Sequence, residues 1–322
     1  MHHYEFHGGP YEMGRQLGVR MRSAGERITE QIPFPVTSER LAFARSCIPF
    51  YETWYPAALA ELRGLSDAQG VSFDTLAGVL LPMYCLTPAP HCSCFAVRTE
   101  EGRSLLGRNS DFLTALADNN ASCRFRRDSY TVWGNTTAFI ELEDGVNNCG
   151  LAAGLTSVQP PAPPRPGLNA GLLLRLILET CCTTTEALTV LQDVPVASSH
   201  TFVLADRSGD IALAECCGTA LAVRRRDYVC AVNAFHLPEM QPFVSPPEDG
   251  WRSEERYETL TRAHIKGVSD AIALLSGKKG FLCQYDPGFI GDTVWSVVYD
   301  LTGEKTYLSE GNPGRTAFHT TG

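Results

Sequence analysis

Residues 92–112 read CSCFAVRTEEGRSLLGRNSDF, and this stretch decides how the rest of the chain is interpreted. Two largely apolar runs flank the turn sequence TEEG, which predicts a tight β-hairpin. The first run begins with Cys92 and Cys94, which a strand would place on the same face. The second run ends in Gly-Arg-Asn-Ser-Asp and contains Arg108 and Asp111. The hairpin therefore brings two thiols, a cation and a carboxylate into one region, although the sequence leaves the strand register open.

Helical and strand patterns alternate in blocks along the chain. Residues 1–88 have apolar residues mostly at helical spacing. From residue 92 onward the order is strands, two helices, strands, helices and strands; residues 136–145 (TTAFIELEDG) are expected to form one strand, and Thr183 and Glu186 have capping-box spacing. Antiparallel hairpins with two separate groups of helices predict an α+β fold with sheets between helical layers. We expect one compact domain with a helical N-terminal segment packed on it.

The composition excludes several classes of function. The chain has 322 residues, 44% of them hydrophobic, and a net charge of -9, so it can form a large core but has no broad basic surface for nucleic acid. No run is long and apolar enough for a membrane helix, and the first residues lack the pattern of a secretory signal. We therefore expect a cytoplasmic protein that binds neither nucleic acid nor membrane.

The chain contains 12 cysteines, which is more than such a protein needs. The close pairs are Cys-x-Cys and Cys-Cys, without the spacing or the histidine pairs of zinc sites, so we expect no metal and no other cofactor. Because no secretory signal is visible, disulfides are not the expected form of these residues. Most of them are predicted to be small buried hydrophobic residues.

A catalytic cysteine acts as its thiolate, which needs a base or a positive charge nearby. Five histidines are available as the base, none of them in a cysteine-protease signature: His91, His200, His236, His264 and His319. A peptide cut directly before Cys92 would instead release its own α-amine, which has a pKa of roughly 7.7–8.0 and can act as a base at neutral pH. Such a site still needs a group that orients the amine, a cation that favours the thiolate and donors for the oxyanion.

The quoted stretch resembles the start of the mature chain in the choloylglycine hydrolases and the acyl-CoA:6-aminopenicillanic acid acyltransferase family, which are N-terminal-nucleophile amidohydrolases. Their pattern is cysteine, a small hydroxyl residue, a strand and then Gly-Arg-Asn-x-Asp. Arg108 lies sixteen residues and Asp111 nineteen residues after Cys92, which is the family spacing, whereas Cys94 would be two residues short. Ser93 occupies the position of the small hydroxyl residue.

Five further segments resemble family motifs in the family's order. They are FHGGPYEMGRQLG (6–18), DGVNNCGLAAG (144–154), AVNAFH (231–236), RSEERYETL (252–260) and TVWSVVYDLTGEKTYLSEGNP (293–313). The resemblance covers nearly the whole chain and implies a four-layer αββα N-terminal-nucleophile hydrolase sandwich. The long segment before Cys92 is similar to that of the acyltransferase branch. It implies self-cleavage between His91 and Cys92, with residues 1–91 as a small chain that stays bound to a large chain of residues 92–322.

The resemblance also implies roles for individual residues. The catalytic set is Cys92, Arg108, Asp111, Asn147, Asn233 and Arg256. In this set Cys92 is the nucleophile, and Asn233 with Asn147 stabilises the oxyanion. The residues predicted to contact the substrate, near a proline-rich loop at residues 159–167, are Tyr84, Cys94 and Phe112.

The implied reaction is cleavage or exchange of the amide bond of a small N-acyl substrate, with no cofactor. Water or an acceptor amine would resolve the acyl-enzyme, and a thioester is a further candidate partner. His91 stands where the penicillin acyltransferase has glycine, and the sequence leaves open whether this bulkier residue slows self-cleavage. The sequence leaves open the acyl group, the choice between hydrolysis and transfer, and whether the chain forms a homo-oligomer.

Two other functions stay open. A catalytically silent member of the fold would be a redox-sensitive binding module that uses its cysteines, and a dipeptidase-like member would cut true peptide bonds. Single residues also have structural alternatives. Asn147 and Asn233 fit turns, Arg108 and Asp111 fit a surface ion pair, and Cys94 fits a packed core thiol.

Overall fold

The computed structural model describes residues 1–86, 91–127, 129–159, 164–244, 251–286 and 288–321. Its helices are α1 (Pro10–Ser23), α2 (Ser38–Trp54), α3 (Pro56–Gln69), α4 (Phe73–Leu80), α5 (Ala170–Thr180), α6 (Thr184–Asp193), α7 (Ser253–Thr261) and α8 (Val268–Leu275), with short 3-10 turns η1 (Ile28–Glu30), η2 (Thr114–Asn119) and η3 (Pro238–Phe243). Its strands are β1 (His2–His7), β2 (His91–Arg98), β3 (Ser104–Leu113), β4 (Ala121–Arg126), β5 (Thr131–Thr136), β6 (Asp144–Asn147), β7 (Leu151–Ser157), β8 (His200–Asp206), β9 (Ile211–Cys217), β10 (Ala220–Arg225), β11 (Tyr228–Ala231), β12 (Gly291–Asp300), β13 (Lys305–Ser309) and β14 (His319–Thr321).

These strands form two sheets. The eight-stranded sheet has the order β1-β4-β5-β6-β7-β8-β9-β10, and the six-stranded sheet has the order β11-β2-β3-β12-β13-β14. The predicted hairpin of residues 92–112 is confirmed, with β2 antiparallel to β3 near the middle of the six-stranded sheet. Strand β3 lies between β2 and β12, and because the other sheet covers one of its faces and helix α8 the other, nearly all of its side chains are buried.

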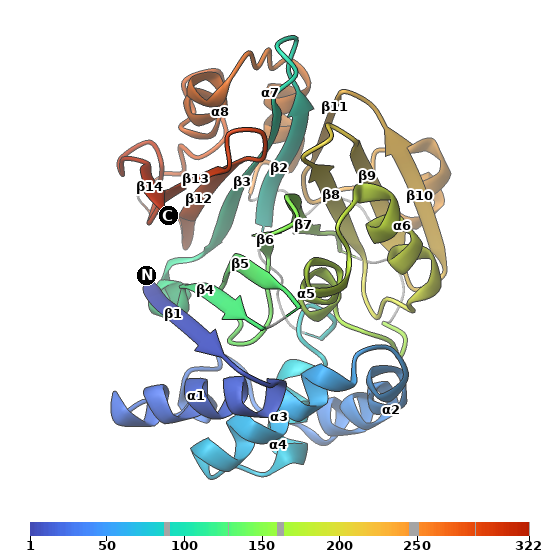
Figure 1. Cartoon of the computed structure of the whole chain (residues 1–322), viewed down its shortest axis with the longest axis vertical. Helices are drawn as coiled ribbons and strands as arrows, with labels where there is room; N and C mark the ends of the chain where they lie inside the picture. Colours follow the sequence, from blue (N-terminus) through green and yellow to red (C-terminus); the bar gives the residue numbers. More distant parts are fainter. Residues whose placement is uncertain (87–90, 128, 160–163, 245–250, 287, 322) are drawn as a thin grey trace.

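The sheets lie between two layers of helices, so the predicted four-layer αββα sandwich is confirmed (Figure 1). Helices α5 and α6 cover the outer face of the eight-stranded sheet, and α7 and α8 cover the six-stranded one. Apolar side chains such as Leu106, Val203 and Trp295 form the core between the sheets. No helix in the described part of the chain is long and apolar enough to cross a membrane.

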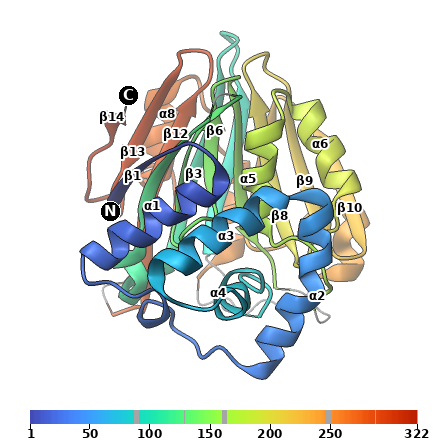
Figure 2. The ribbon, with the colours of Figure 1, turned by 60° about the horizontal axis from the view of Figure 1, so that its bottom comes forward.

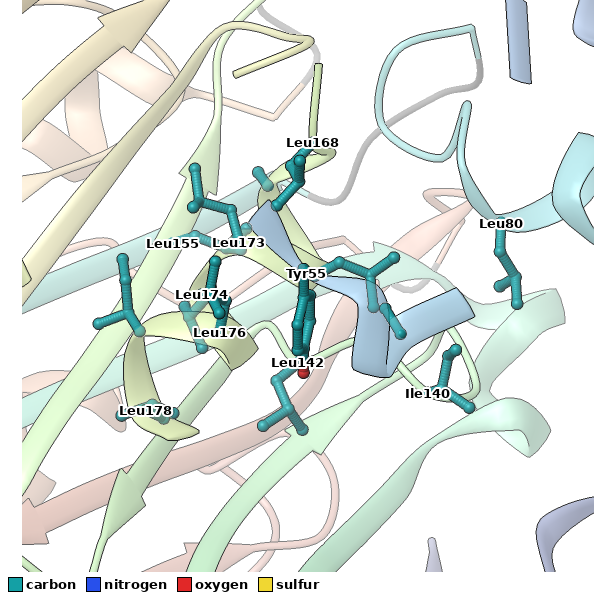
Figure 3. Close-up of a cluster of buried hydrophobic side chains, with 14 of the residues drawn as sticks. Tyr55, Leu80, Ile140, Leu142, Leu155, Leu168, Leu173, Leu174, Leu176 and Leu178 are labelled. Carbon is teal, nitrogen blue, oxygen red and sulfur yellow. The ribbon is translucent and has the colours of Figure 1, made fainter. Parts of the chain in front are cut away.

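The N-terminal segment contributes both a strand and a group of helices to this body. Strand β1 pairs in parallel with β4 at the edge of the eight-stranded sheet. Helices α1 to α4 lie together at one end of the sandwich (Figure 2). Figure 3 shows Tyr55 and Leu80 of this segment packed in one cluster with Leu142, Leu173 and Leu178 of the sandwich. The segment is therefore joined to the sheets by a continuous apolar core.

A buried ion-pair network reinforces this junction. Arg175 of α5 pairs with Glu61 of α3 at 2.7 Å and with Glu179 of its own helix at 2.8 Å. The Tyr55 hydroxyl donates to Glu179 at 2.8 Å. The side chains of Arg175, Glu61 and Glu179 are at most 4% exposed, so loss of one partner would leave an uncompensated buried charge.

Helices α1 and α3 touch through their backbones, which requires glycine at two positions. A Cβ atom on Gly14 would lie 1.9 Å from the carbonyl oxygen of Glu61, and one on Gly64 would lie 1.9 Å from the carbonyl oxygen of Tyr11. Neither backbone can give way without the helices separating, so no larger residue fits at this crossing.

Gly64→Ala is expected to lower the free energy of unfolding by about 1–3 kcal/mol or more, because the added methyl group must push α1 and α3 apart. Urea unfolding of the full chain measures the effect. Gly9→Ala is the matched control, since a Cβ atom at Gly9 has nothing within 4 Å and its φ is -76°. Equal stability of Gly64→Ala and the wild type would contradict the close approach.

The prediction of a strand over residues 136–145 is wrong for most of that range. Strand β5 ends at Thr136 and β6 begins at Asp144, with irregular backbone between them. Side chains take over the backbone hydrogen bonds there: Thr136 Oγ1 accepts from Ala138 N, and Glu143 Oε1 accepts from Thr137 N. This irregular segment directs Glu143 into the interior between the sheets.

The expectation that disulfides are absent is also wrong at one pair. Cys149 and Cys182 form a disulfide with their Cα atoms 5.1 Å apart, which joins the turn after β6 to the loop before α6. The predicted capping box of α6 at Thr183 and Glu186 is confirmed. Both thiols of the Cys-x-Cys segment are free and buried.

Candidate active site

The register of β2 and β3 places the predicted nucleophile against polar residues. Cys92 pairs with Ser110, and His91 pairs with Asp111. Residues directly opposite on one face of an antiparallel pair have Cβ atoms about 4.5–5.5 Å apart, so the side chains of Ser110 and Cys92 are neighbours on one face of the sheet. Cys92, Ser110 and Asp111 are all fully buried in the chain.

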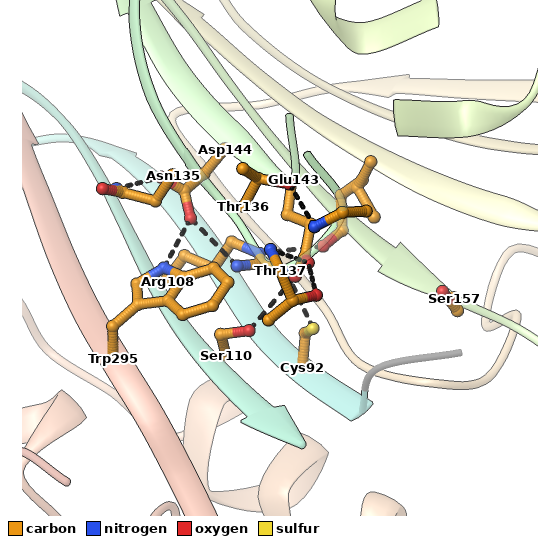
Figure 4. Close-up of polar contacts among 12 residues, drawn as sticks. Cys92, Arg108, Ser110, Asn135, Thr136, Thr137, Glu143, Asp144, Ser157 and Trp295 are labelled. Carbon is orange, nitrogen blue, oxygen red and sulfur yellow. Dashed lines mark hydrogen bonds and ion pairs between the residues drawn. The ribbon is translucent and has the colours of Figure 1, made fainter. Parts of the chain in front are cut away.

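Arg108 is the residue that contacts the thiol. Its Nη2 donates to Cys92 Sγ at 2.8 Å and to Glu143 Oε2 at 3.1 Å, while its Nη1 donates to Asp144 Oδ2 at 2.9 Å (Figure 4). Its Nε donates to the carbonyl oxygen of Leu155 at 2.9 Å. Four of the five N–H groups of the guanidinium are therefore engaged, and the group is held rigidly beside the sulfur, between β3 and the opposite sheet.

The thiol is protonated in the intact chain. Burial raises the pKa of Cys92 to about 12; Arg108 and Arg256 oppose this rise, and Glu143 and Asp111 add to it. The guanidinium next to the sulfur thus lowers the pKa of the thiol by less than burial and the two carboxylates together raise it. Deprotonation at neutral pH needs a base.

Asn233 and Arg256 hold the backbone of Cys92. Asn233 Oδ1 accepts from Cys92 N at 3.1 Å, and Asn233 Nδ2 donates to the carbonyl oxygen of Ser157 at 2.9 Å. Arg256 Nη1 donates to the carbonyl oxygen of Cys92 at 2.7 Å and to Ser93 Oγ at 3.0 Å, and its Nη2 donates to Asn233 Oδ1 at 2.8 Å. The structure thus brings the predicted asparagine and arginine together at the predicted nucleophile.

Asp111 lies on the same strand as Arg108 but forms a separate group of contacts. It accepts from the hydroxyls of Tyr285 at 2.8 Å and Thr293 at 2.6 Å, and lies 3.6 Å from Arg256 Nη1. Burial raises the pKa of its carboxyl above the ordinary value, against the opposing effect of Arg256. Asp111 therefore acts on the Cys92 region indirectly, because it pairs with Arg256, which donates to the carbonyl oxygen of Cys92.

The side chain of His91 packs against an aromatic ring. Its ring stacks on Trp251 with centroids 4.5 Å apart and planes 12° apart. Gly291 leaves the room for this, because a Cβ atom there would lie 1.9 Å from the Trp251 ring. Burial, together with the charge of Arg256, lowers the pKa of His91 to about 3, so its imidazole is neutral at physiological pH.

Two residues predicted for the site, Asn147 and Cys94, have structural contacts instead. Asn147 was predicted as an oxyanion donor, but its amide nitrogen donates to the carbonyl oxygens of Leu178 and Cys181, and its amide oxygen accepts from Cys149 N and Leu151 N. It braces the turn after β6, as Asn commonly does.

Cys94 was predicted to contact the substrate, but it is a packed core thiol. It has no exposed surface and belongs to the apolar core between the two sheets. A Cβ atom on Gly154 would lie 2.7 Å from Cys94 Sγ, which shows how closely the opposite sheet covers the thiol.

A cavity of about 180 Å³ lies beside this constellation. Its lining is mostly apolar and comes from four parts of the chain: Gln31, Ile32, Pro33, Phe34, Met83, Tyr84, Phe112, Leu113, Leu116, Asn119, Thr137, Ala138 and Phe139. The predicted substrate residues Tyr84 and Phe112 therefore line one cavity. Tyr84 and Phe139 both have positive φ, at 60° and 61°, a conformation that non-glycine residues rarely adopt.

Glu143 contacts both the lining of the cavity and Arg108, the residue that donates a hydrogen bond to the Cys92 thiol. Glu143 Oε1 accepts from Thr137 Oγ1 at 2.7 Å and from the Tyr84 hydroxyl at 3.4 Å, and both donors line the cavity. Part of the proline-rich loop predicted to shape the pocket, residues 160–163, lies outside the described residues.

Sequence reasoning did not predict the two carboxylates that contact Arg108 in the site. Glu143 and Asp144 are fully buried and both contact Arg108. Asp144 also accepts from Trp295 Nε1 at 3.0 Å and from the Tyr299 hydroxyl at 2.7 Å. The available signal was the stretch AFIELEDG, where acidic residues interrupt an apolar run without a turn residue between them.

Comparison with known proteins adds independent information. The family model described as acyl-coenzyme A:6-aminopenicillanic acid acyl-transferase matches residues 97–315. The matched range begins after Cys92 and includes Arg108, Asp111, Asn233 and Arg256. No curated protein sequence matches the chain.

Several solved structures are similar to this one. Penicillin V acylase from Agrobacterium tumefaciens has 18% identity and a TM-score of 0.50, with 68% of this chain and 83% of that chain covered. The N-acylethanolamine-hydrolyzing acid amidase ortholog of Caenorhabditis elegans has 16% identity and a TM-score of 0.49, with coverage of 66% and 93%. A variant of conjugated bile acid hydrolase from Clostridium perfringens has 12% identity and a TM-score of 0.45, with coverage of 71% and 92%. At this identity the first match shows a shared fold.

Proposed function

Because the chain belongs to the acyl-coenzyme A:6-aminopenicillanic acid acyl-transferase family, we propose that it cleaves or exchanges the amide bond of a small N-acyl substrate through an acyl-enzyme on Cys92. The observation that carries the proposal is the 2.8 Å hydrogen bond from Arg108 to Cys92 Sγ, at a residue whose backbone is held on both sides by Asn233 and Arg256. This arrangement supplies a fixed cation for the thiolate and amide and guanidinium donors near the reacting atom.

The proposed mature enzyme is produced by a cut between His91 and Cys92. The cut releases the α-amine of Cys92, and Asn233 Oδ1 is proposed to orient that amine, which is supported by its hydrogen bond from Cys92 N in the intact chain. The amine then takes the thiol proton as the sulfur attacks the substrate carbonyl, and returns it to the leaving amine. Asn233 keeps its proposed part in stabilising the oxyanion through Nδ2, which donates to the carbonyl oxygen of Ser157 in the intact chain and would turn from it toward the oxyanion.

Residues 1–91 are proposed to remain bound after the cut as a small chain. The pairing of β1 with β4, the apolar cluster in Figure 3 and the Arg175–Glu61 pair all join this segment to residues 92–322. The segment also forms part of the cavity wall, through residues 31–34 and 83–84. The small chain is thus proposed as a part of the substrate site.

The cavity beside Glu143 is proposed to bind the acyl group. Its lining favours an apolar acyl chain, and its volume of about 180 Å³ is below the roughly 300–1,000 Å³ of sites for drug-sized ligands. Water or an acceptor amine then resolves the acyl-enzyme. We expect turnover of N-acyl amides with short apolar acyl groups.

The test combines activity with mass spectrometry. Purified protein is incubated with amides of one amine and acyl groups of increasing length, and the released amine is measured. Denaturing mass spectrometry of the same samples is expected to show two fragments separated between His91 and Cys92, with the acyl mass on the first peptide of the large fragment. A fully active chain that stays intact would refute the cut, and an acyl group on another residue would refute Cys92 as nucleophile.

A further inference from the structure

The self-cleavage step poses a chemical problem that the mature enzyme does not have. In the intact chain the nitrogen of Cys92 is an amide that donates to Asn233 Oδ1, so no α-amine exists to take the thiol proton. The His91 imidazole is stacked on Trp251 and is a weak base in this setting. Some other group must accept the proton before the sulfur can attack.

Glu143 occupies the position that such a base requires. Glu143 Oε2 and Cys92 Sγ accept from the same Arg108 nitrogen at 3.1 and 2.8 Å, so at most two hydrogen-bond lengths separate them. The Ser110 hydroxyl, which lies opposite Cys92 in the β-ladder, donates to Glu143 Oε2 at 3.2 Å. The Ser110 hydroxyl contacts the carboxylate and belongs to the residue paired with Cys92 on the same face of the ladder, so it is the group available to carry a proton between the two.

The surroundings of Glu143 hold its carboxylate in a fixed position near the thiol. Its carboxylate is fully buried and receives hydrogen bonds on both oxygens, with Thr137 N and Thr137 Oγ1 on Oε1 at 3.1 and 2.7 Å. Figure 4 shows Cys92, Ser110, Thr137 and Glu143 grouped around Arg108. Because one guanidinium faces two carboxylates here, those of Glu143 and Asp144, a thiolate would add a further negative charge. Moving the thiol proton onto Glu143 keeps the total charge of the group unchanged.

We propose that Glu143, with Ser110 as its relay, is the base that takes the Cys92 thiol proton in the intact chain. The sulfur then forms a bond to the His91 carbonyl carbon, and the carbon–nitrogen bond to Cys92 breaks. The nitrogen takes up the proton held by Glu143 and becomes the α-amine, while a thioester joins His91 to Cys92 Sγ. Water then attacks the thioester carbonyl and yields the His91 carboxylate, the Cys92 thiol and one proton.

This inference rests on the proposed function for its cleavage step, and Glu143→Gln tests it with two readouts. The first is the fraction of chain cut between residues 91 and 92 over time. The second is the rate at which iodoacetamide alkylates Cys92 at pH 7, read from the peptide that still contains both His91 and Cys92. Loss of a general base predicts that both rates fall, by at least about tenfold and up to the 10²–10⁴-fold typical of such groups. A purely electrostatic role predicts the opposite, because loss of a negative charge makes the thiolate easier to form.

Asp144→Asn is the matched control, since it removes a carboxylate from the same Arg108 without touching the Ser110 contact. It is expected to raise the alkylation rate. Ser110→Ala removes the relay but keeps both carboxylates, and is expected to slow both readouts. It keeps the test decisive if circular dichroism shows that Glu143→Gln fails to fold.

The outcomes separate this inference from the proposed function. Normal cutting and faster alkylation in Glu143→Gln would overturn the role of Glu143 while self-cleavage stands. A wild type that is never cut, together with slower alkylation in Glu143→Gln, would refute self-cleavage and support Glu143 as the base. Unchanged alkylation in both Glu143→Gln and Ser110→Ala would overturn the inference in either case.

Discussion

Cys92→Ala is expected to remain a single uncut chain and to lose turnover of N-acyl amides by a factor of roughly 10⁶, the scale seen when a covalent nucleophile is removed. The sulfur is the atom that Arg108 contacts, and no second thiol can replace it: Cys94 lies two residues further along the strand and is enclosed by the opposite sheet. Denaturing mass spectrometry and a released-amine assay measure the two losses.

Cys94→Ala is the matched control for this variant. Cys94 has the same burial, the same strand and the same chemistry as Cys92, but it packs in the core between the sheets. It is expected to be cut and to turn over substrate while losing some stability, because a small cavity remains where the sulfur was. Residual amide cleavage by Cys92→Ala at the level of Cys94→Ala would remove Cys92 from the mechanism.

Arg108→Met is expected to lower the free energy of unfolding by about 3–5 kcal/mol and to abolish self-cleavage. Loss of the guanidinium leaves Glu143 and Asp144 buried next to each other without a counter-charge, which is the costly way to break a buried ion pair. It also removes the donor 2.8 Å from Cys92 Sγ, so alkylation of the thiol at neutral pH should slow markedly. Urea unfolding and iodoacetamide alkylation measure the two effects separately.

Arg175→Met separates the stability effect from the chemical one. Arg175 is also buried and also pairs with two carboxylates, Glu61 and Glu179, but it lies at the junction with α3 and makes no contact with Cys92 in the described structure. It is expected to lose comparable stability while the folded fraction keeps the reactivity of Cys92. If Arg108→Met were cut and alkylated as fast as Arg175→Met, Arg108 would be a structural residue alone.

Much of the fold follows from local sequence signals. The hairpin at residues 92–112, the grouping of helices and strands and the capping box of α6 depend on short-range periodicity and turn chemistry, and each was predicted correctly. The segment at residues 136–145 shows the limit of such reasoning. Its alternating composition favours a strand, but hydrogen bonds to Thr136 and Glu143 side chains hold most of it in an irregular path.

The predictions for the candidate site also agree with the structure at some residues and differ from it at others. Cys92, Arg108, Asp111, Asn233 and Arg256 were predicted from the resemblance to family motifs, and the structure brings all five together. Asn147 had an equally good motif, yet its amide is used up by the turn around it. A motif shows which residue types are present, whereas the free donors of a side chain depend on neighbours that are distant in sequence.

The sequence by itself determined the α+β class of the fold, and its resemblance to the family motifs indicated the cysteine on which the proposed chemistry depends. These follow from patterns within about twenty residues, such as the spacing from Cys92 to Asp111. Only the tertiary structure decided which carboxylates surround the thiol. Glu143 directly precedes β6 of the other sheet and is 51 residues from Cys92, and it reaches Arg108 because the two sheets pack face to face and exclude water from the polar groups between them. That exclusion of water is what raises the pKa of the Cys92 thiol and makes the choice of its base a matter of three-dimensional arrangement.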